Sequence, residues 1–133
     1  MRLFGGKTIL DYKMHEFAIA SGIMDTVLSE AEKNKAKKVK KMVVEIGQLS
    51  MVGLEQLKFS LDVLKEGTIA SKADIEIVKT PVKLKCKQGH KTEKFLKEPL
   101  FASIREVRCA KCKKKAEIVG GRECQIKEIE IDD

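Results

Sequence analysis

The spacing of four side chains in the second half of the chain constrains its fold more than any other feature. Cys86 is followed after three residues by His90, and 18 residues further on Cys109 is followed after two residues by Cys112. Two ligands separated by two to four residues can bind one metal ion from a single tight turn, and a second such pair completes a tetrahedron. The spacing therefore predicts two turns that meet at one Zn²⁺ site.

The chemistry of these ligands indicates a structural site. Zn²⁺ prefers soft thiolates, and a set of three cysteines and one histidine leaves no open position for a substrate. Gly89 suits the first turn because glycine readily adopts a positive φ. The fourth ligand has two candidates, His90 and Cys124. We favour His90 because its distance from Cys86 suits a turn, whereas Cys124 lies in a strand pattern where a small buried side chain is expected.

The charge distribution separates a basic segment from the rest of the chain. The net charge is +7, but residues 81–116 alone hold 12 basic and three acidic residues, while the remainder is slightly acidic. This shift predicts a zinc-binding module at 81–116, inserted into a host domain formed by 14–80 and 117–133. Such a short segment buries little core, so metal binding would supply on the order of 10 kcal/mol of its folding free energy.

The host segments alternate between helical and strand patterns. Apolar residues recur every three or four positions over 15–33 and 54–64, which predicts two amphipathic helices. They alternate with polar residues over 42–46, 73–77 and 124–131, which predicts three strands. We therefore expect an α+β fold with two helices packed on a three-stranded sheet. The apolar stripe of the first helix consists of Phe17, Ala20, Ile23, Met24, Val27, Leu28 and Ala31.

Several classes of protein are excluded by the same sequence. No apolar run approaches the roughly 20 residues that a membrane helix needs. The first 13 residues do not resemble a signal peptide, so we expect a cytoplasmic protein, in which four cysteines suit metal binding better than disulfides. The chain contains no Ser/His/Asp, Cys/His or glycine-rich phosphate motif, so we do not expect an enzyme.

The order of motifs resembles that of the HypA family of hydrogenase nickel-insertion proteins. The resemblance begins at Met14-His15-Glu16, continues through Val43–Ser50 and the zinc module, and ends with the strand at about Ile131. It therefore covers nearly the whole chain. The family usually places Cys-x2-Cys at both turns, whereas the first pair here contains a histidine.

This resemblance implies a nickel metallochaperone rather than an enzyme. Nickel would be bound at Met14, His15 and Glu16 and delivered to the large subunit of [NiFe]-hydrogenase, with help from a HypB-type GTPase. Composition alone would make His15 an ordinary surface or helix-capping histidine. In the family, the terminal amine of the Met-His-Glu motif also binds nickel. Residues 1–13 precede that motif here, so they are either an extension that is not native or a sign that nickel is bound differently.

A zinc-ribbon protein that binds nucleic acid is the alternative. The basic residues around the two turns would provide the electrostatic attraction to phosphates that such a protein needs. However, Phe95 and Phe101 are the only aromatic residues of the module, which is a poor platform for base stacking. Lysines around a zinc turn form a solvated surface more often than a nucleic-acid site. We therefore do not expect nucleic acid as a partner.

Overall fold

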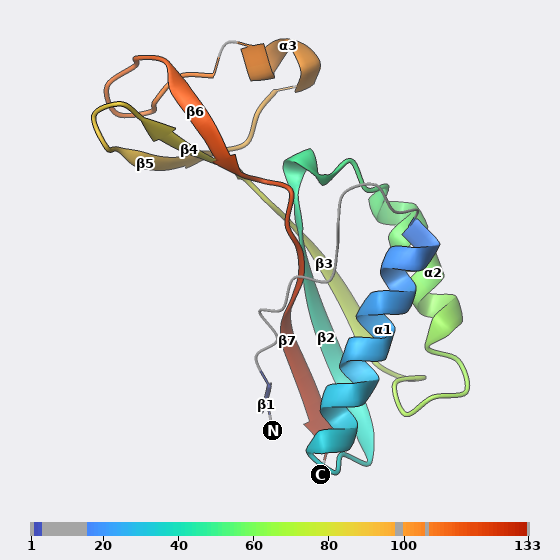
Figure 1. Cartoon of the computed structure of the whole chain (residues 1–133). Helices are drawn as coiled ribbons and strands as arrows, with labels where there is room; N and C mark the ends of the chain where they lie inside the picture. Colours follow the sequence, from blue (N-terminus) through green and yellow to red (C-terminus); the bar gives the residue numbers. More distant parts are fainter. Residues whose placement is uncertain (1, 4–15, 98–99, 106, 133) are drawn as a thin grey trace. The chain divides into compact units, whose positions relative to one another are not determined.

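The computed structural model describes residues 2–3, 16–97, 100–105 and 107–132, and these residues form two compact units. The first unit comprises the described residues of Met1–Glu45, Val52–Val78 and Cys124–Asp133, and the second comprises those of Ile46–Met51 and Lys79–Glu123. The basic segment 81–116 lies entirely within the second unit. Each unit has its own sheet, as Figure 1 shows.

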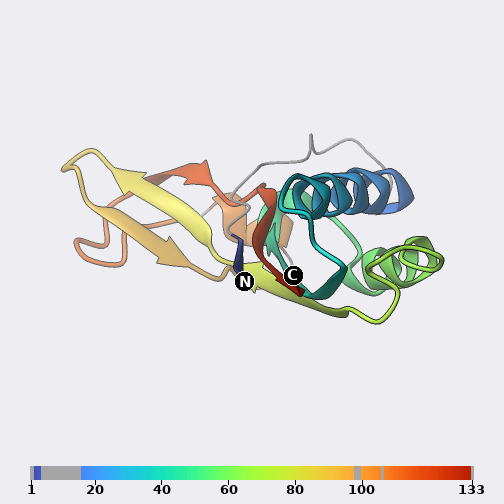
Figure 2. The same cartoon turned by 90° about the horizontal axis from the view of Figure 1, so that it is seen from below.

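The first unit has the expected α+β architecture. Its sheet has the strand order β1-β7-β2-β3, and two helices lie side by side along it (Figures 1 and 2). The helices are α1 (Glu16–Lys33) and α2 (Leu54–Leu64), and the strands are β1 (Arg2–Leu3), β2 (Lys38–Gly47), β3 (Asp74–Thr80) and β7 (Cys124–Asp132). The two predicted helices and the three predicted strands are confirmed. The bounds of the helices agree with the prediction within one residue, whereas β2 and β3 are longer than predicted.

The sheet differs from the prediction by one additional strand. β1 pairs with β7 in antiparallel orientation, so that Arg2 lies opposite Glu130 and Leu3 lies opposite Ile129. A sheet edge presents backbone N–H and C=O groups that a further strand can satisfy. Two residues are too short to show an alternating pattern, so the sequence contained no signal for this strand.

The buried stripe of α1 also differs slightly from the expected one. Phe17 is 56% exposed, whereas Ile19, which was not assigned to the stripe, is buried. Successive residues of a helix are rotated by about 100°, so Phe17 and Ile19 lie at opposite edges of the buried stripe, and the elements packed on α1 cover only the edge with Ile19. The assignment of Phe17 to the core was therefore wrong. The buried residues of the helix are Ile19, Ala20, Ile23, Met24, Val27 and Ala31.

The second unit has a small apolar core of its own. Its sheet has the strand order β5-β4-β6, and the unit also contains the helix α3. These elements are β4 (Val82–Cys86), β5 (Lys91–Lys94), α3 (Leu100–Arg105) and β6 (Ala116–Gly120). Val82 and Leu84 alternate with exposed lysines along β4 and pack against Leu49, Leu96 and Val107. The core therefore includes a residue, Leu49, that lies more than 30 positions before the zinc module in the sequence.

Gln48 attaches the segment 46–51 to the second unit. Its side chain is buried, donates a 2.7 Å hydrogen bond to the carbonyl oxygen of Leu96 and accepts a 2.7 Å hydrogen bond from the N–H of Leu96. One side-chain amide thus pairs with both backbone groups of a residue 48 positions away. The backbone of the same segment pairs with Gly121, whose carbonyl oxygen accepts a 2.7 Å hydrogen bond from the N–H of Leu49.

Replacement of Gln48 by Ala is expected to destabilise the second unit by about 2 to 4 kcal/mol. The change leaves the buried N–H and C=O groups of Leu96 without partners, and each unsatisfied group costs about 1 to 3 kcal/mol. Urea unfolding of the unmodified protein and of Gln48→Ala would measure the difference in the free energy of unfolding. Gln125→Ala is the matched control, because the Gln125 amide donates a hydrogen bond to the carboxylate of Glu45, which is only half-buried. Equal effects of the two substitutions would contradict the role assigned to Gln48.

Candidate metal centre

The first turn of the centre follows the end of β4. The N–H of Gly89 donates a 3.0 Å hydrogen bond to the carbonyl oxygen of Cys86, and the N–H of Cys86 donates a 3.1 Å bond to the carbonyl oxygen of His90. Gly89 has a φ of 87°, which is the left-handed conformation that glycine adopts without strain. The expected positive φ at Gly89 is confirmed, and the turn brings Cys86 and His90 to the same end of the sheet.

The second turn is also closed by two backbone hydrogen bonds to its first cysteine, but it is one residue longer. The N–H of Lys113 donates a 3.0 Å bond to the carbonyl oxygen of Cys109, and the N–H of Cys109 donates a 2.8 Å bond to the carbonyl oxygen of Lys114. The left-handed residue here is Lys113, with a φ of 63°. Because lysine has no preference for this conformation, no local sequence pattern predicts it. The N–H of Lys111 also donates a 3.4 Å hydrogen bond to the sulfur of Cys109.

The two turns bring the four predicted side chains together. One ligand atom from each of Cys86, His90, Cys109 and Cys112 lies within 4.8 Å of all the others. The sulfurs of Cys86 and Cys112 are 3.9 Å apart, and Nδ1 of His90 lies 3.6 Å from the sulfur of Cys109. Around a tetrahedral zinc ion with typical bond lengths, two sulfur ligands lie about 3.8 Å apart, and a nitrogen and a sulfur ligand lie about 3.6 Å apart. The geometry therefore suits a single tetrahedral metal ion.

The electrostatics of the cluster favour a cation. A hydrogen bond from the N–H of Cys112, supported by that of Lys111, lowers the pKa of the Cys109 thiol to about 6. The N–H of Lys114 lowers the pKa of the Cys112 thiol, but burial and the neighbouring thiols of Cys109 and Cys86 outweigh it and leave that pKa raised. The Cys112 thiol therefore ionises less readily beside the other two sulfurs, and a bound cation would stabilise its thiolate.

Cys124, the alternative fourth ligand, is not part of this cluster. It begins β7 in the first unit, where it is buried, and burial raises the pKa of its thiol to about 11. A buried thiol of this kind behaves as a small hydrophobic side chain. The structure thus places His90, and not Cys124, beside the three other cysteines.

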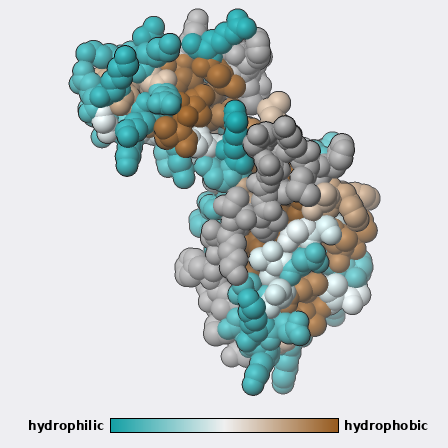
Figure 3. Space-filling view, viewed as in Figure 1, coloured by the Kyte–Doolittle hydropathy of each residue, from teal (hydrophilic) through white to brown (hydrophobic). Residues whose placement is uncertain are grey.

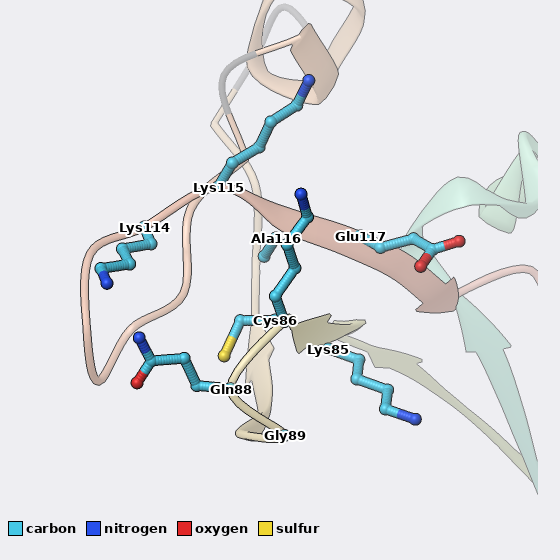
Figure 4. A pocket seen from close by; sticks show the side chains of 9 residues that line it. Lys85, Cys86, Gln88, Gly89, Lys114, Lys115, Ala116 and Glu117 are labelled. Carbon is cyan, nitrogen blue, oxygen red and sulfur yellow. The ribbon is translucent and has the colours of Figure 1, made fainter.

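The lysines around the two turns lie on a solvated surface. They border a hollow of about 760 Å³ beside Cys86, together with Gln88, Gly89, Ala116 and Glu117. Figure 4 shows Lys85 and Lys115 directed away from the sulfur of Cys86. These two lysines and Lys114 are exposed. The basic residues therefore surround the cluster without taking part in it.

Of the three predicted nickel-binding residues, the structure describes only Glu16. Met14 and His15 lie outside the described residues. Glu16 is the first residue of α1, and its Oε1 accepts a 3.0 Å hydrogen bond from the N–H of Gly53. Gly53 is the N-cap of α2 and has no side chain to cap this helix. The carboxylate of Glu16 therefore caps a second helix, a contact that no local sequence pattern indicated.

The fold and the cluster together define a two-unit α+β protein with a metal-binding centre of three cysteines and one histidine. Within the described ranges, no helix is both long enough and apolar enough to cross a membrane. A sequence model of the family described as "Hydrogenase/urease nickel incorporation, metallochaperone, hypA" matches residues 14–131. The chain belongs to this HypA family, as the motifs predicted.

Individual relatives agree with this assignment. The chain is 39% identical to the hydrogenase maturation factor HypA of Methanothermobacter thermautotrophicus over 90% of this chain and 98% of the relative. It is 38% identical to the HypA of Methanosarcina barkeri, with 90% and 96% coverage. Among solved structures, the solution structure of the Ni metallochaperone HypA from Helicobacter pylori has a TM-score of 0.62, at 25% identity and with 90% and 98% coverage.

Proposed function

We propose that this protein is a nickel metallochaperone that binds Ni²⁺ near the start of α1 and delivers it to the large subunit of [NiFe]-hydrogenase during maturation. The observation that carries the proposal is the match to a nickel-incorporation family over residues 14–131, nearly the whole chain. The resemblance of the fold to a Ni metallochaperone of known structure supports it. The protein acts by binding and transfer, in the reducing environment of the cytoplasm.

Zinc is the resident metal in this proposal. Cys86, His90, Cys109 and Cys112 would hold it, and the distances among their ligand atoms support a tetrahedral ion of that size. The bound ion would connect the two turns and order the second unit. Four protein ligands leave no position for a substrate, so zinc would be retained while nickel is transferred.

Nickel would be bound by the segment Met14-His15-Glu16. The imidazole of His15 is a suitable donor for Ni²⁺, and backbone nitrogens next to it can form chelate rings with the same ion. The carboxylate of Glu16 already accepts a hydrogen bond from Gly53, so Glu16 would contribute its backbone nitrogen. Its side chain would hold this end of α1 against the start of α2.

Two partners follow from this function, the hydrogenase large subunit and a HypB-type GTPase. A nucleic acid is not favoured, although the second unit is strongly basic. Phe95 is the exposed aromatic residue of that unit within the described side chains, and a single ring is a poor platform for base stacking.

Nickel transfer in a purified system tests the proposed function. The nickel-loaded protein is incubated with a nickel-free precursor of the large subunit, the two are separated, and the nickel in each is measured. We expect nickel in the large subunit and unchanged zinc in the chaperone, because the two metals occupy different ligand sets. A chain that retains its nickel in the presence of the precursor and of the GTPase would contradict the proposal.

A further inference from the structure

The first unit has a hollow where α1 and α2 begin. The hollow has a volume of about 530 Å³ and is lined by Glu16, Phe17, Glu55, Gln56, Phe59 and Ser60. Phe17 is 56% exposed and Phe59 is 70% exposed, so two large aromatic side chains border the same open space. Figure 3 shows hydrophobic surface over these two helices. Exposed apolar groups that are surrounded by polar residues are typical of interaction sites.

The residues of the hollow have a marked chemical bias. Two of the six carry carboxylates, two carry aromatic rings, and none carries a positive charge. Glu55 is exposed and forms no ion pair within the described part of the chain. Further along α2, in contrast, Asp62 is paired with Lys58 at 2.9 Å and with Lys65 at 3.4 Å. The start of α2 therefore presents an acidic group that lacks a basic partner.

A guanidinium group complements this combination. Its planar cation stacks on aromatic faces, and its N–H groups form charge-assisted hydrogen bonds with carboxylates. A purely apolar side chain would leave Glu55 desolvated without a partner, and an acidic one would be repelled by it. The lining thus favours an arginine over either alternative.

We propose that this hollow receives an arginine side chain of the hydrogenase large-subunit precursor. The proposal rests on the proposed function, because it takes the large subunit as the protein that accepts nickel. Glu16 lines the hollow and directly follows Met14 and His15 in the chain, so a partner bound here would be close to the segment that carries nickel. The hollow would therefore align the two proteins for transfer.

A second hollow that is also lined by Phe59 supports a protein partner over a free small molecule. It has a volume of about 470 Å³, shares Glu55 and Phe59 with the first hollow, and is otherwise lined by Leu54, Ile75 and Ile77 and by the ion pair of Lys58 and Asp62. Phe59 and Glu55 thus border two depressions, and the second of them adds three aliphatic side chains and a Lys58–Asp62 ion pair. A protein surface can fill both at once, with an arginine in the first and an aliphatic side chain in the second.

Binding of the purified, nickel-free large-subunit precursor tests the proposal. We expect Phe59→Ser and Glu55→Lys each to weaken binding by about tenfold or more, as for a residue central to an interface. The matched controls are Phe95→Ser, which replaces an exposed phenylalanine in the other unit, and Glu32→Lys, which reverses an exposed carboxylate at the far end of α1. Both controls should bind within about twofold of the unmodified protein. Phe59 and Glu55 are exposed, so these variants should fold normally and retain nickel.

A small probe tests the arginine directly. N-acetyl-arginine amide should shift the NMR signals of the Phe17 and Phe59 rings, whereas its neutral isostere N-acetyl-citrulline amide should not. Equal shifts with both probes, or precursor binding unchanged in Phe59→Ser and Glu55→Lys, would overturn the proposal. Loss of GTPase binding alone in these variants would also overturn it, since the occupant would be a different protein. Failure of the proposed function would instead appear as absent nickel binding or transfer in the unmodified chain.

Discussion

Replacement of both Cys109 and Cys112 by Ala is expected to release the bound zinc and to unfold the second unit. These two residues supply half of the ligand set, and Lys113 holds a left-handed conformation in the turn between them and β6. Metal binding to such a site supplies on the order of 10 kcal/mol, far more than the small core of this unit can replace. Metal analysis should fall from about one zinc per chain to none, and limited proteolysis should cut within residues 79–123.

Single substitutions distinguish the ligands from the remaining cysteine. Cys124→Ala should retain a full equivalent of zinc, because this thiol is buried in β7 and is not part of the cluster. Its cost should be about 1 kcal/mol of stability in the first unit. His90→Ala should weaken zinc binding. Full retention of zinc by the double cysteine variant, or loss of zinc from Cys124→Ala with retention in His90→Ala, would show that the ligands are assigned wrongly.

Nickel affinity is expected to depend on His15 and on the residue that begins the chain. A terminal amine at Met14 can bind Ni²⁺ together with adjacent amide nitrogens and the imidazole, because short chelate rings then form. In the full chain the Met14 nitrogen is an amide, which must lose a proton before it can bind a metal. Isothermal titration near neutral pH should therefore show weaker nickel binding by the full chain than by a version that starts at Met14.

The decisive variant is His15→Ala in the version that starts at Met14. We expect nickel binding to be abolished, while zinc content and the far-ultraviolet circular dichroism remain unchanged. Glu16→Gln is the control, because an amide oxygen can still accept the hydrogen bond from Gly53 and the backbone nitrogen is intact. Its nickel affinity should stay within about threefold. Equal affinity in the full chain, the shorter chain and its His15→Ala variant would place the nickel site elsewhere.

The local patterns of the sequence determined the class of fold and the position of the metal cluster. The two amphipathic helices and three strands could be predicted because the periods of 3.6 and two residues act within a single element. Each pair of ligands, Cys86 with His90 and Cys109 with Cys112, could be predicted because it lies in one short turn of at most five residues. The preference of Zn²⁺ for four ligands then indicated that the two turns meet. The order of these motifs was also sufficient to indicate the HypA family.

Contacts between distant residues were decided only by the tertiary structure. The carboxylate of Glu16 caps α2 across 37 positions, and Gln48 pairs with Leu96 across 48 positions. Nothing in the sequence around Glu16 or Gln48 distinguishes it from a glutamate or glutamine on the surface. The exposure of Phe17 was likewise set by the direction in which α1 packs on the sheet and on α2. A periodic pattern specifies that a helix has an apolar face, but the edge of that face depends on the elements it meets, which lie far away in the sequence.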